Sequence, residues 1–164
     1  MSFKEKSVSK KIMLTGGAAA VVDDADHEWL SAMKWHCANG YAVHSVWDKE
    51  KKRPASVSMA RAIMDAPVGA QVDHINGDRL DNRRRNLRLC TRWENSANRR
   101  KPRGANGSRY KGVYRNAYGW WASIRANRKQ HYLGSFRKEE DAARAYNSAA
   151  VSHFGEFARL NEVE

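Results

Sequence analysis

The chain has little cysteine and no long apolar run. Cys37 and Cys90 are its only cysteines, and two isolated thiols cannot supply the paired CxxC ligands of a structural zinc site. We therefore expect no structural zinc and no disulfide, only two small buried or half-buried thiols. No stretch approaches the roughly 18 apolar residues of a membrane-spanning helix, and the apolar block at residues 12–15 is too short for a signal peptide. These absences predict a cytosolic protein without a membrane partner.

Negative charge is also scarce. The chain carries 30 Lys and Arg against 18 Asp and Glu, a net charge of +12. Residues 71–115 hold 13 of the basic and 4 of the acidic side chains. Such a field attracts polyanions, of which nucleic acid is the main candidate and a membrane surface the rival. We interpret this stretch as a phosphate-binding surface that continues into a basic tether at residues 99–109. The phosphate contacts predicted within its ordered part are Arg83, Arg84, Arg85, Arg88 and Arg92.

Short alternating runs separated by turn signals predict a mixture of strands and helices. In the first half we expect one or two strands at residues 12–22 with a break at Gly16-Gly17, a short helix at 27–33, a hairpin at 35–47 turned at residues 38–40, and a short helix at 57–64. In the last third we expect three strands within residues 110–136 and one helix at 139–154.

The most informative segment is residues 71–95. It predicts a strand end at residues 72–74, a turn at 76–78 and a second strand at 86–90. Thr91 then suits the N-cap of a helix, with a glutamate three residues later in the capping-box pattern. The segment therefore has the order strand, loop, strand, helix.

Side chains in this segment divide into core, surface and polar groups. In the second strand the alternation directs Leu87 and Leu89 inward and Arg88 outward. Three asparagines are interpreted as turn and cap residues rather than ligands: Asn76, Asn82 and Asn98. The remaining polar residues, Asp73, His74, Asn86 and Asn95, are the candidates for chemistry.

A carboxylate, an imidazole and an amide can together support phosphodiester hydrolysis. A histidine, with a reference pKa of about 6.5, can take a proton from water at neutral pH. A hard divalent cation held by oxygen ligands can neutralise the charge that develops on the phosphate. One carboxylate and one amide carbonyl suit Mg²⁺ or Mn²⁺ better than Zn²⁺.

The pattern Asp73-His74, Asn86 and Asn95, with spacings of 12 and 9 residues, resembles the HNH or ββα-metal nuclease motif. The resemblance is to its zinc-free form in phage and intron homing endonucleases. It implies that Asp73 and Asn95 bind the metal, that His74 is the general base, and that Asn86 braces the loop and orients the imidazole. Relatives of this type often carry a histidine before the arginine at position 61, where this chain has Ala60. If that histidine assists the chemistry, activity is reduced here.

The last third of the chain resembles the APETALA/ethylene-response-factor DNA-binding domain. The resemblance covers residues 110–161 and rests on the runs YKGVYR, WWASIR, YLGSF, AARAY and ARLN. It implies a three-stranded antiparallel sheet packed on one helix, with Trp120, Ala122 and Ile124 facing the helix. The opposite face would read the major groove of DNA. The contacts that it implies are Lys111, Tyr114, Trp121, Arg125 and Tyr132. The alternative is that Trp121 packs against the preceding domain.

The predicted fold class is α+β, in three parts. These are a ββα-metal HNH nuclease domain at residues 1–98, a basic linker at 99–109 and the DNA-binding domain at 110–161. The predicted function is metal-dependent cleavage of double-stranded DNA by a homing-type or nicking endonuclease, in the host cytosol if the chain is phage-encoded. No protein partner is evident. The alternative is a DNA-binding regulator whose nuclease motif is inactive.

Overall fold

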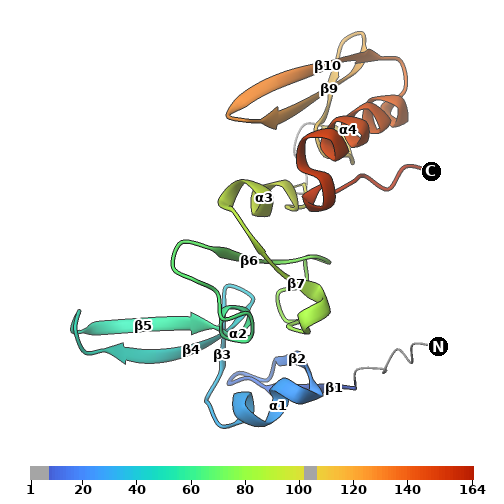
Figure 1. Ribbon diagram of the computed structural model, residues 1–164. Coiled ribbons are helices and arrows are strands. Elements are labelled where there is room, and N and C mark those ends of the chain that lie inside the picture. The colour runs from blue at the N-terminus through green and yellow to red at the C-terminus, as the bar shows by residue number, and fades with distance from the viewer. Residues whose placement is uncertain (1–7, 102–106) are drawn as a thin grey trace, which may run out of the picture. The chain divides into compact units, whose positions relative to one another are not determined.

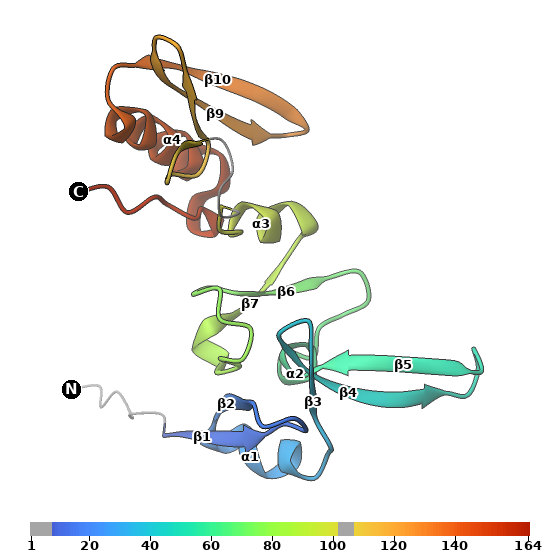
Figure 2. The same ribbon diagram turned by 180° about the vertical axis from the view of Figure 1, so that it is seen from behind.

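The structure is a computed structural model that describes residues 8–101 and 107–164. The first seven residues of the predicted nuclease domain, and residues 102–106 of the predicted linker, lie outside these ranges. The chain divides into two compact units, Met1–Arg92 and Trp93–Glu164. Each unit mixes short strands with helices (Figures 1 and 2). The prediction of a mixed α and β chain is therefore confirmed.

The first unit begins with two small sheets joined by a helix. The pair β1–β2 is antiparallel, and β3, β4 and β5 form a three-stranded antiparallel sheet in that order. The elements are β1 (Ser9–Met13), β2 (Ala19–Asp23), α1 (Asp24–Ser31), β3 (His36–Ala38), β4 (Tyr41–Asp48), β5 (Arg53–Ser58) and α2 (Met59–Ile63). Asn39 and Gly40 both have positive φ between β3 and β4, as an Asn-Gly hairpin turn requires.

Strand β5 was not predicted. Its residues are mostly exposed, so the strand carries no apolar alternation and begins with an arginine and a proline that argue against one. It forms because β4 supplies a pairing edge along its whole length, from Val43 opposite Ser58 to Asp48 opposite Arg53. The predicted helix at residues 57–64 is consequently shorter, and α2 begins at Met59.

The core of the first unit lies where α1, α2 and the small sheets meet. Its buried side chains come from β1, β2, α1, β4, α2 and the segments that follow β1 and α1, with one more from residue 87: Ile12, Leu14, Ala20, Val22, Leu30, Trp35, Ala42, Met59, Ala60, Ile63 and Leu87. Leu87 belongs to a second hairpin, in which β6 (Gln71–His74) pairs antiparallel with β7 (Leu87–Cys90), just after the short 3-10 turn η1 (Arg84–Asn86). The core therefore anchors the hairpin that carries the candidate catalytic residues.

The second unit is a three-stranded sheet with a helix on one face. Its strands lie in the order β10-β9-β8, all antiparallel, and α4 packs against them (Figure 1). Helix α3 begins at the boundary between the units. The elements are α3 (Arg92–Ala97), β8 (Val113–Asn116), β9 (Gly119–Ala126), β10 (Lys129–Phe136), α4 (Glu139–Phe154) and the 3-10 turn η3 (Gly155–Phe157). The three strands and the helix occur where the sequence predicts them.

Small residues let α4 lie close to this sheet. Ala142 and Ala143 of α4 are fully buried against Val113 and Ala122. As predicted, Ala122 and Ile124 face the helix, and Trp120 packs at the edge of the same core. Among the described residues, no helix is long and apolar enough to cross a membrane. Cys90 is buried, whereas Cys37 is exposed rather than half-buried, and neither forms a disulfide.

Gly112 gives a test of this packing. It has φ +72°, and a Cβ at this position would lie 2.0 Å from a Tyr146 ring carbon and 2.7 Å from the Ser123 carbonyl oxygen. We expect Gly112→Ala to lower the unfolding free energy of the second unit by about 1–3 kcal/mol, the usual cost of overpacking. Gly155→Ala is the matched control, because Gly155 also has positive φ but has open space around it. Calorimetric melting should show the larger loss for Gly112→Ala, and equal losses would contradict this packing.

Candidate functional site

Asp73 and His74 end strand β6, and both are buried, each with 5% of its surface exposed. Burial of two polar side chains in one short strand is costly unless each has partners. The loop between β6 and β7 provides those partners, together with the neighbouring strand β7. The site is therefore built from one hairpin of the first unit.

The imidazole of His74 is held by Asn82. His74 Nε2 lies 3.2 Å from Asn82 Oδ1. The Asn82 amide group is itself oriented, because its Nδ2 donates to the Leu80 carbonyl at 3.2 Å. With Oδ1 thus directed at the ring, Nε2 must carry the hydrogen, and Nδ1 is the basic nitrogen of the neutral ring. Asn82 therefore selects the tautomer of His74.

Asn82 is held in place through its backbone. Its N–H donates to the Val21 carbonyl at 2.7 Å, and the Val21 N–H donates to the Leu80 carbonyl at 2.8 Å. Strand β2 thus fastens the loop beside the core, and Asn82 is 1% exposed. We interpreted Asn82 from the sequence as a turn residue, so its contact with His74 was missed. The role of Asn82 depends on the contact between this loop and β2, which joins residues 61 positions apart in the sequence and is not visible in a local pattern.

Asn86 braces the same loop. Its Oδ1 accepts from the Asn76 N–H at 3.0 Å, and its Nδ2 donates to the Asn76 side-chain oxygen at 3.1 Å and to the Asp81 carbonyl at 2.7 Å. These bonds tie both ends of the loop together. Asn86 therefore sits where a loop brace is needed, while the side chain bonded to the imidazole is Asn82.

Burial also sets the charge of His74. Removal from water lowers the pKa of His74 from its usual 6.5, against the raising effects of the Asn82 hydrogen bond and the nearby Asp73, Asp78 and Asp81 charges. The ring is therefore neutral at pH 7. A neutral, oriented imidazole is the form that accepts a proton.

Asp73 is paired with Arg88 across the hairpin. The two residues are opposite each other in the β6–β7 register. Arg88 Nε and Nη2 donate to Asp73 Oδ2 at 3.0 and 2.7 Å. The Arg88 side chain is only 12% exposed, whereas Leu89 is 44% exposed. The predicted direction of both side chains is thus wrong: the buried carboxylate draws Arg88 inward, and Leu89 faces out.

Two other arginines of the predicted phosphate surface are also engaged with carboxylates. Arg83 donates to both oxygens of Asp81 at 2.7 and 2.6 Å, and the guanidinium lowers the pKa of that carboxyl. Arg84 donates to both oxygens of the buried Asp26 in α1 at 2.8 and 2.7 Å. The Arg83 pair lies within the loop, and the Arg84 pair joins η1 to α1. Arg85 and Arg92 are exposed.

The remaining predicted site positions lie on helices. Ala60 is buried in the core on α2, 3% exposed. Asn95 lies within α3, in the second unit, so its meeting with Asp73 stays a prediction. Among the described residues, no group of three or more His, Cys, Asp or Glu side chains could hold a metal ion. A metal at this hairpin would therefore depend on an amide as well as the Asp73 carboxylate.

The second unit presents three aromatic rings on the sheet face away from α4. Tyr114 and Trp121 are stacked, with ring centroids 4.3 Å apart and planes 18° apart, and Trp121 lies 6.3 Å from Tyr132 on the third strand. Tyr132 is 64% exposed, and Arg125 is exposed on β9. The structure thus brings together four of the five predicted sheet contacts. Lys111 instead is half-buried before β8, and its Nζ donates to the Ala97 carbonyl.

Comparison with known proteins connects the hairpin to a family. A family model described as HNH endonuclease matches residues 65–97, which include both strands of this hairpin. The chain is 37% identical over 99 residues to "Uncharacterized HNH endonuclease L560" of Acanthamoeba polyphaga mimivirus, an alignment that covers 60% of this chain and 50% of that protein. The chain thus spans about half the length of the mimivirus relative.

A second relative is covered more fully. The chain is 36% identical over 96 residues to "Protein 3.8" of Escherichia phage T7, which covers 57% of this chain and 78% of the phage protein. No solved structure matches the chain. The family match shows an HNH endonuclease domain at residues 65–97 of this chain, and the alignment with the phage protein shows that the chain and that protein belong to one family.

Proposed function

We propose that the chain is a divalent-metal-dependent DNA endonuclease, in which the β6–β7 hairpin of the first unit carries the general base and the sheet of the second unit holds the duplex. The observation that carries this proposal is the buried, neutral imidazole of His74, held by Asn82 and adjacent to the Asp73 carboxylate. Both residues lie within the stretch that matches the HNH endonuclease model. Hydrolysis of a phosphodiester needs a base that takes a proton from water and a cation that stabilises the charge on the phosphate, and these two residues could provide the base and one ligand of the cation.

His74 would act as the general base. Because Asn82 accepts the hydrogen on Nε2, Nδ1 is the nitrogen of the neutral ring whose lone pair would take a proton from water. Proton transfer of this kind typically contributes about 10²–10⁴-fold to a rate. Asn86 would act indirectly, because its three hydrogen bonds fix the loop that carries Asn82.

Asp73 and Asn95 would hold the metal. A carboxylate and an amide carbonyl are oxygen donors, which hard divalent ions prefer, so the residues present fit Mg²⁺ or Mn²⁺. When bound, such an ion stabilises the charge that develops on the phosphate and on the leaving oxygen. We expect no structural zinc in addition, since the chain has two cysteines and lacks paired CxxC ligands. A single metal site per chain would favour nicking of one strand over cutting of both.

The second unit would hold the DNA through its open sheet face. Three aromatic rings and Arg125 lie on the side that α4 leaves uncovered, and a β-sheet fits the width of a major groove. The resemblance of residues 110–161 to the APETALA/ethylene-response-factor domain supports this proposal. Because the two binding surfaces are on one chain, the second contact is intramolecular, and two weak modules could together act tightly at a preferred site.

One observation favours the alternative, a DNA-binding protein that does not cut. Arg88 donates twice to Asp73 Oδ2, so a cation would have to share this carboxylate with a guanidinium. Like charges repel, and the pair would weaken metal binding unless the metal used the other oxygen or Arg88 moved. The presence of Asp73, His74 and Asn95 together still favours the enzyme.

A plasmid assay separates the two functions. Purified full-length chain with supercoiled plasmid and Mg²⁺ should convert the supercoiled form to the open circular form. The same mixture with EDTA should leave the plasmid intact, because no cation then stabilises the developing charge. Equal conversion with and without EDTA, or no conversion in either mixture, would contradict the nuclease function and favour the alternative, a DNA-binding protein that does not cut.

A further inference from the structure

A cationic pocket lies in the second unit, apart from the aromatic sheet face. It has a volume of about 320 Å³ and is lined by nine residues. Five of them are basic: Arg100, Lys101, Arg109, Lys111 and Arg159. The acidic lining residue is Glu162. The pocket thus carries an excess of positive charge in a small volume, which is the composition of an anion site.

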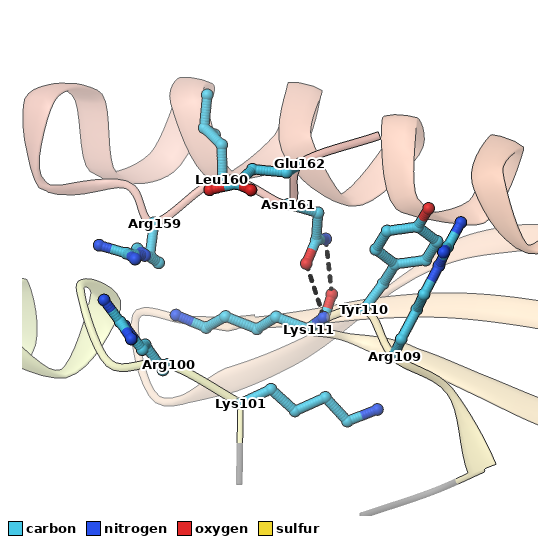
Figure 3. Close-up of a pocket in the computed structure, with 9 residues that line it drawn as sticks. All are labelled: Arg100, Lys101, Arg109, Tyr110, Lys111, Arg159, Leu160, Asn161 and Glu162. Carbon is cyan, nitrogen blue, oxygen red and sulfur yellow. Dashed lines mark hydrogen bonds between the residues drawn. The ribbon is translucent and has the colours of Figure 1, made fainter. Parts of the chain in front are cut away.

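The long basic side chains come from three separate segments. Figure 3 shows the charged ends of Arg100, Lys111 and Arg159 gathered at one side of the pocket, whereas Lys101 and Arg109 extend toward the other. Each lysine ammonium also donates to a backbone carbonyl, Lys101 to that of Ser108 and Lys111 to that of Ala97, so the two differ in the side of the pocket that they reach. The side with three convergent cations is therefore the part that suits an anion.

The backbone of Lys111 is held by the side chain of Asn161. Its N–H donates to Asn161 Oδ1 at 2.7 Å, and its carbonyl accepts from Asn161 Nδ2 at 3.0 Å. Asn161 is in turn bonded at both its backbone groups by Asn147 of α4, at 2.8 and 2.9 Å. This chain of bonds holds the C-terminal segment and its Arg159 beside Lys111, so the pocket is built into the fold.

The positive charges of Lys111 and Arg159 in this pocket repel each other. Burial, together with the positive charge of Arg159, lowers the pKa of Lys111 from 10.5 to about 8. A half-buried ammonium beside a guanidinium is unfavourable, and an anion between them would relieve the repulsion. Arginine also offers paired N–H donors that match the oxygens of a phosphate.

We propose that this pocket holds a phosphate group of the DNA backbone, with Lys111, Arg159 and Arg100 as its ligands. The inference rests on the proposed function, in which the second unit binds duplex DNA. A backbone phosphate is favoured over a free anion because Arg100 and Lys101 are themselves part of the basic tether at residues 99–109, whose composition suits binding along a chain of phosphates. The pocket would fix the position of the duplex, while the aromatic sheet face would contact the bases.

The salt dependence of DNA binding tests this site. Full-length Lys111→Met and Arg159→Gln are compared with wild type for affinity to a short duplex over a series of KCl concentrations at pH 7. Each variant should flatten the slope of log affinity against log salt by about one unit, because one phosphate contact is lost. Arg144→Gln is the matched control: Arg144 is exposed on α4, outside the pocket, and bonded to Asp141. Its slope should equal that of wild type.

Two further arms separate the possible failures. Trp121→Ala should weaken duplex binding by roughly 5–150-fold at unchanged salt slope, as loss of a base contact does. Duplex binding that is weakened by Trp121→Ala but has wild-type slopes in both pocket variants would overturn the pocket and leave the proposed function standing. A wild-type chain that binds no duplex would overturn both.

The source of the phosphate is tested with inorganic phosphate alone. Its titration into wild type and Arg159→Gln, followed by NMR, should show weak binding at most. Saturation that depends on Arg159, combined with unchanged duplex slopes, would assign the pocket to a free anion and overturn the proposal. Circular dichroism melting of each variant verifies that the second unit stays folded.

Discussion

Replacement of His74 by alanine should reduce Mg²⁺-dependent plasmid nicking by about 10²–10⁴-fold, the usual contribution of a positioned general base. The structural reason is that His74 is neutral at pH 7 because burial lowers its pKa, and that Asn82 fixes its tautomer. An alanine would leave the water molecule without a proton acceptor. The rate is measured by the loss of supercoiled plasmid under single-turnover conditions.

His27→Ala is the matched control for this prediction. His27 lies on α1 of the same unit, and its Nε2 lies 3.4 Å from the exposed Ser31 hydroxyl. This variant should cut at the wild-type rate. Equal rates for wild type and His74→Ala, in protein that melts normally, would show that the imidazole has no part in the chemistry.

Removal of Arg88 should produce the largest loss of stability. Arg88 and Asp73 form a buried pair, with side-chain exposures of 12% and 6%. Arg88→Met leaves the Asp73 carboxylate buried without its guanidinium, which typically costs about 3–5 kcal/mol. The readout is hydrogen exchange of amides in residues 8–92 across a urea series, so that the first unit is followed by itself.

The double variant Asp73→Leu with Arg88→Met is the control for this loss. Replacing both partners of a buried pair by apolar side chains is often neutral or even stabilising, so the double variant should recover most of the stability of the first unit. A double variant as unstable as Arg88→Met alone would mean that packing of the arginine, and not its pairing with Asp73, holds the hairpin.

Local patterns in the sequence were sufficient for much of the fold. The α4 helix has a run of three acids at its start and alanines along one face, and both signals depend only on neighbouring residues. The turn at Asn39-Gly40 is likewise a short-range signal. These elements occur where they were predicted because nothing distant in the chain competes with them.

Contacts between distant segments could not be read in this way. Arg88 points inward only because Asp73 lies opposite it in the register, and alternation of leucines alone gave the reverse. Asn82 meets His74 only because β2 fastens the loop through Val21. The order of Asp73, His74 and Asn86 could be recognised from spacing, whereas the partners that set their charge and orientation required the tertiary structure.

The central claim is that one divalent cation binds next to His74 through Asp73 and Asn95. Titration of Mn²⁺ followed by electron paramagnetic resonance tests it directly, because free and bound Mn²⁺ give different signals. The wild-type chain should bind one ion, and Asp73→Asn and Asn95→Leu should each bind it at least about tenfold more weakly, as loss of a ligand requires. Wild-type affinity in both variants would contradict the claim.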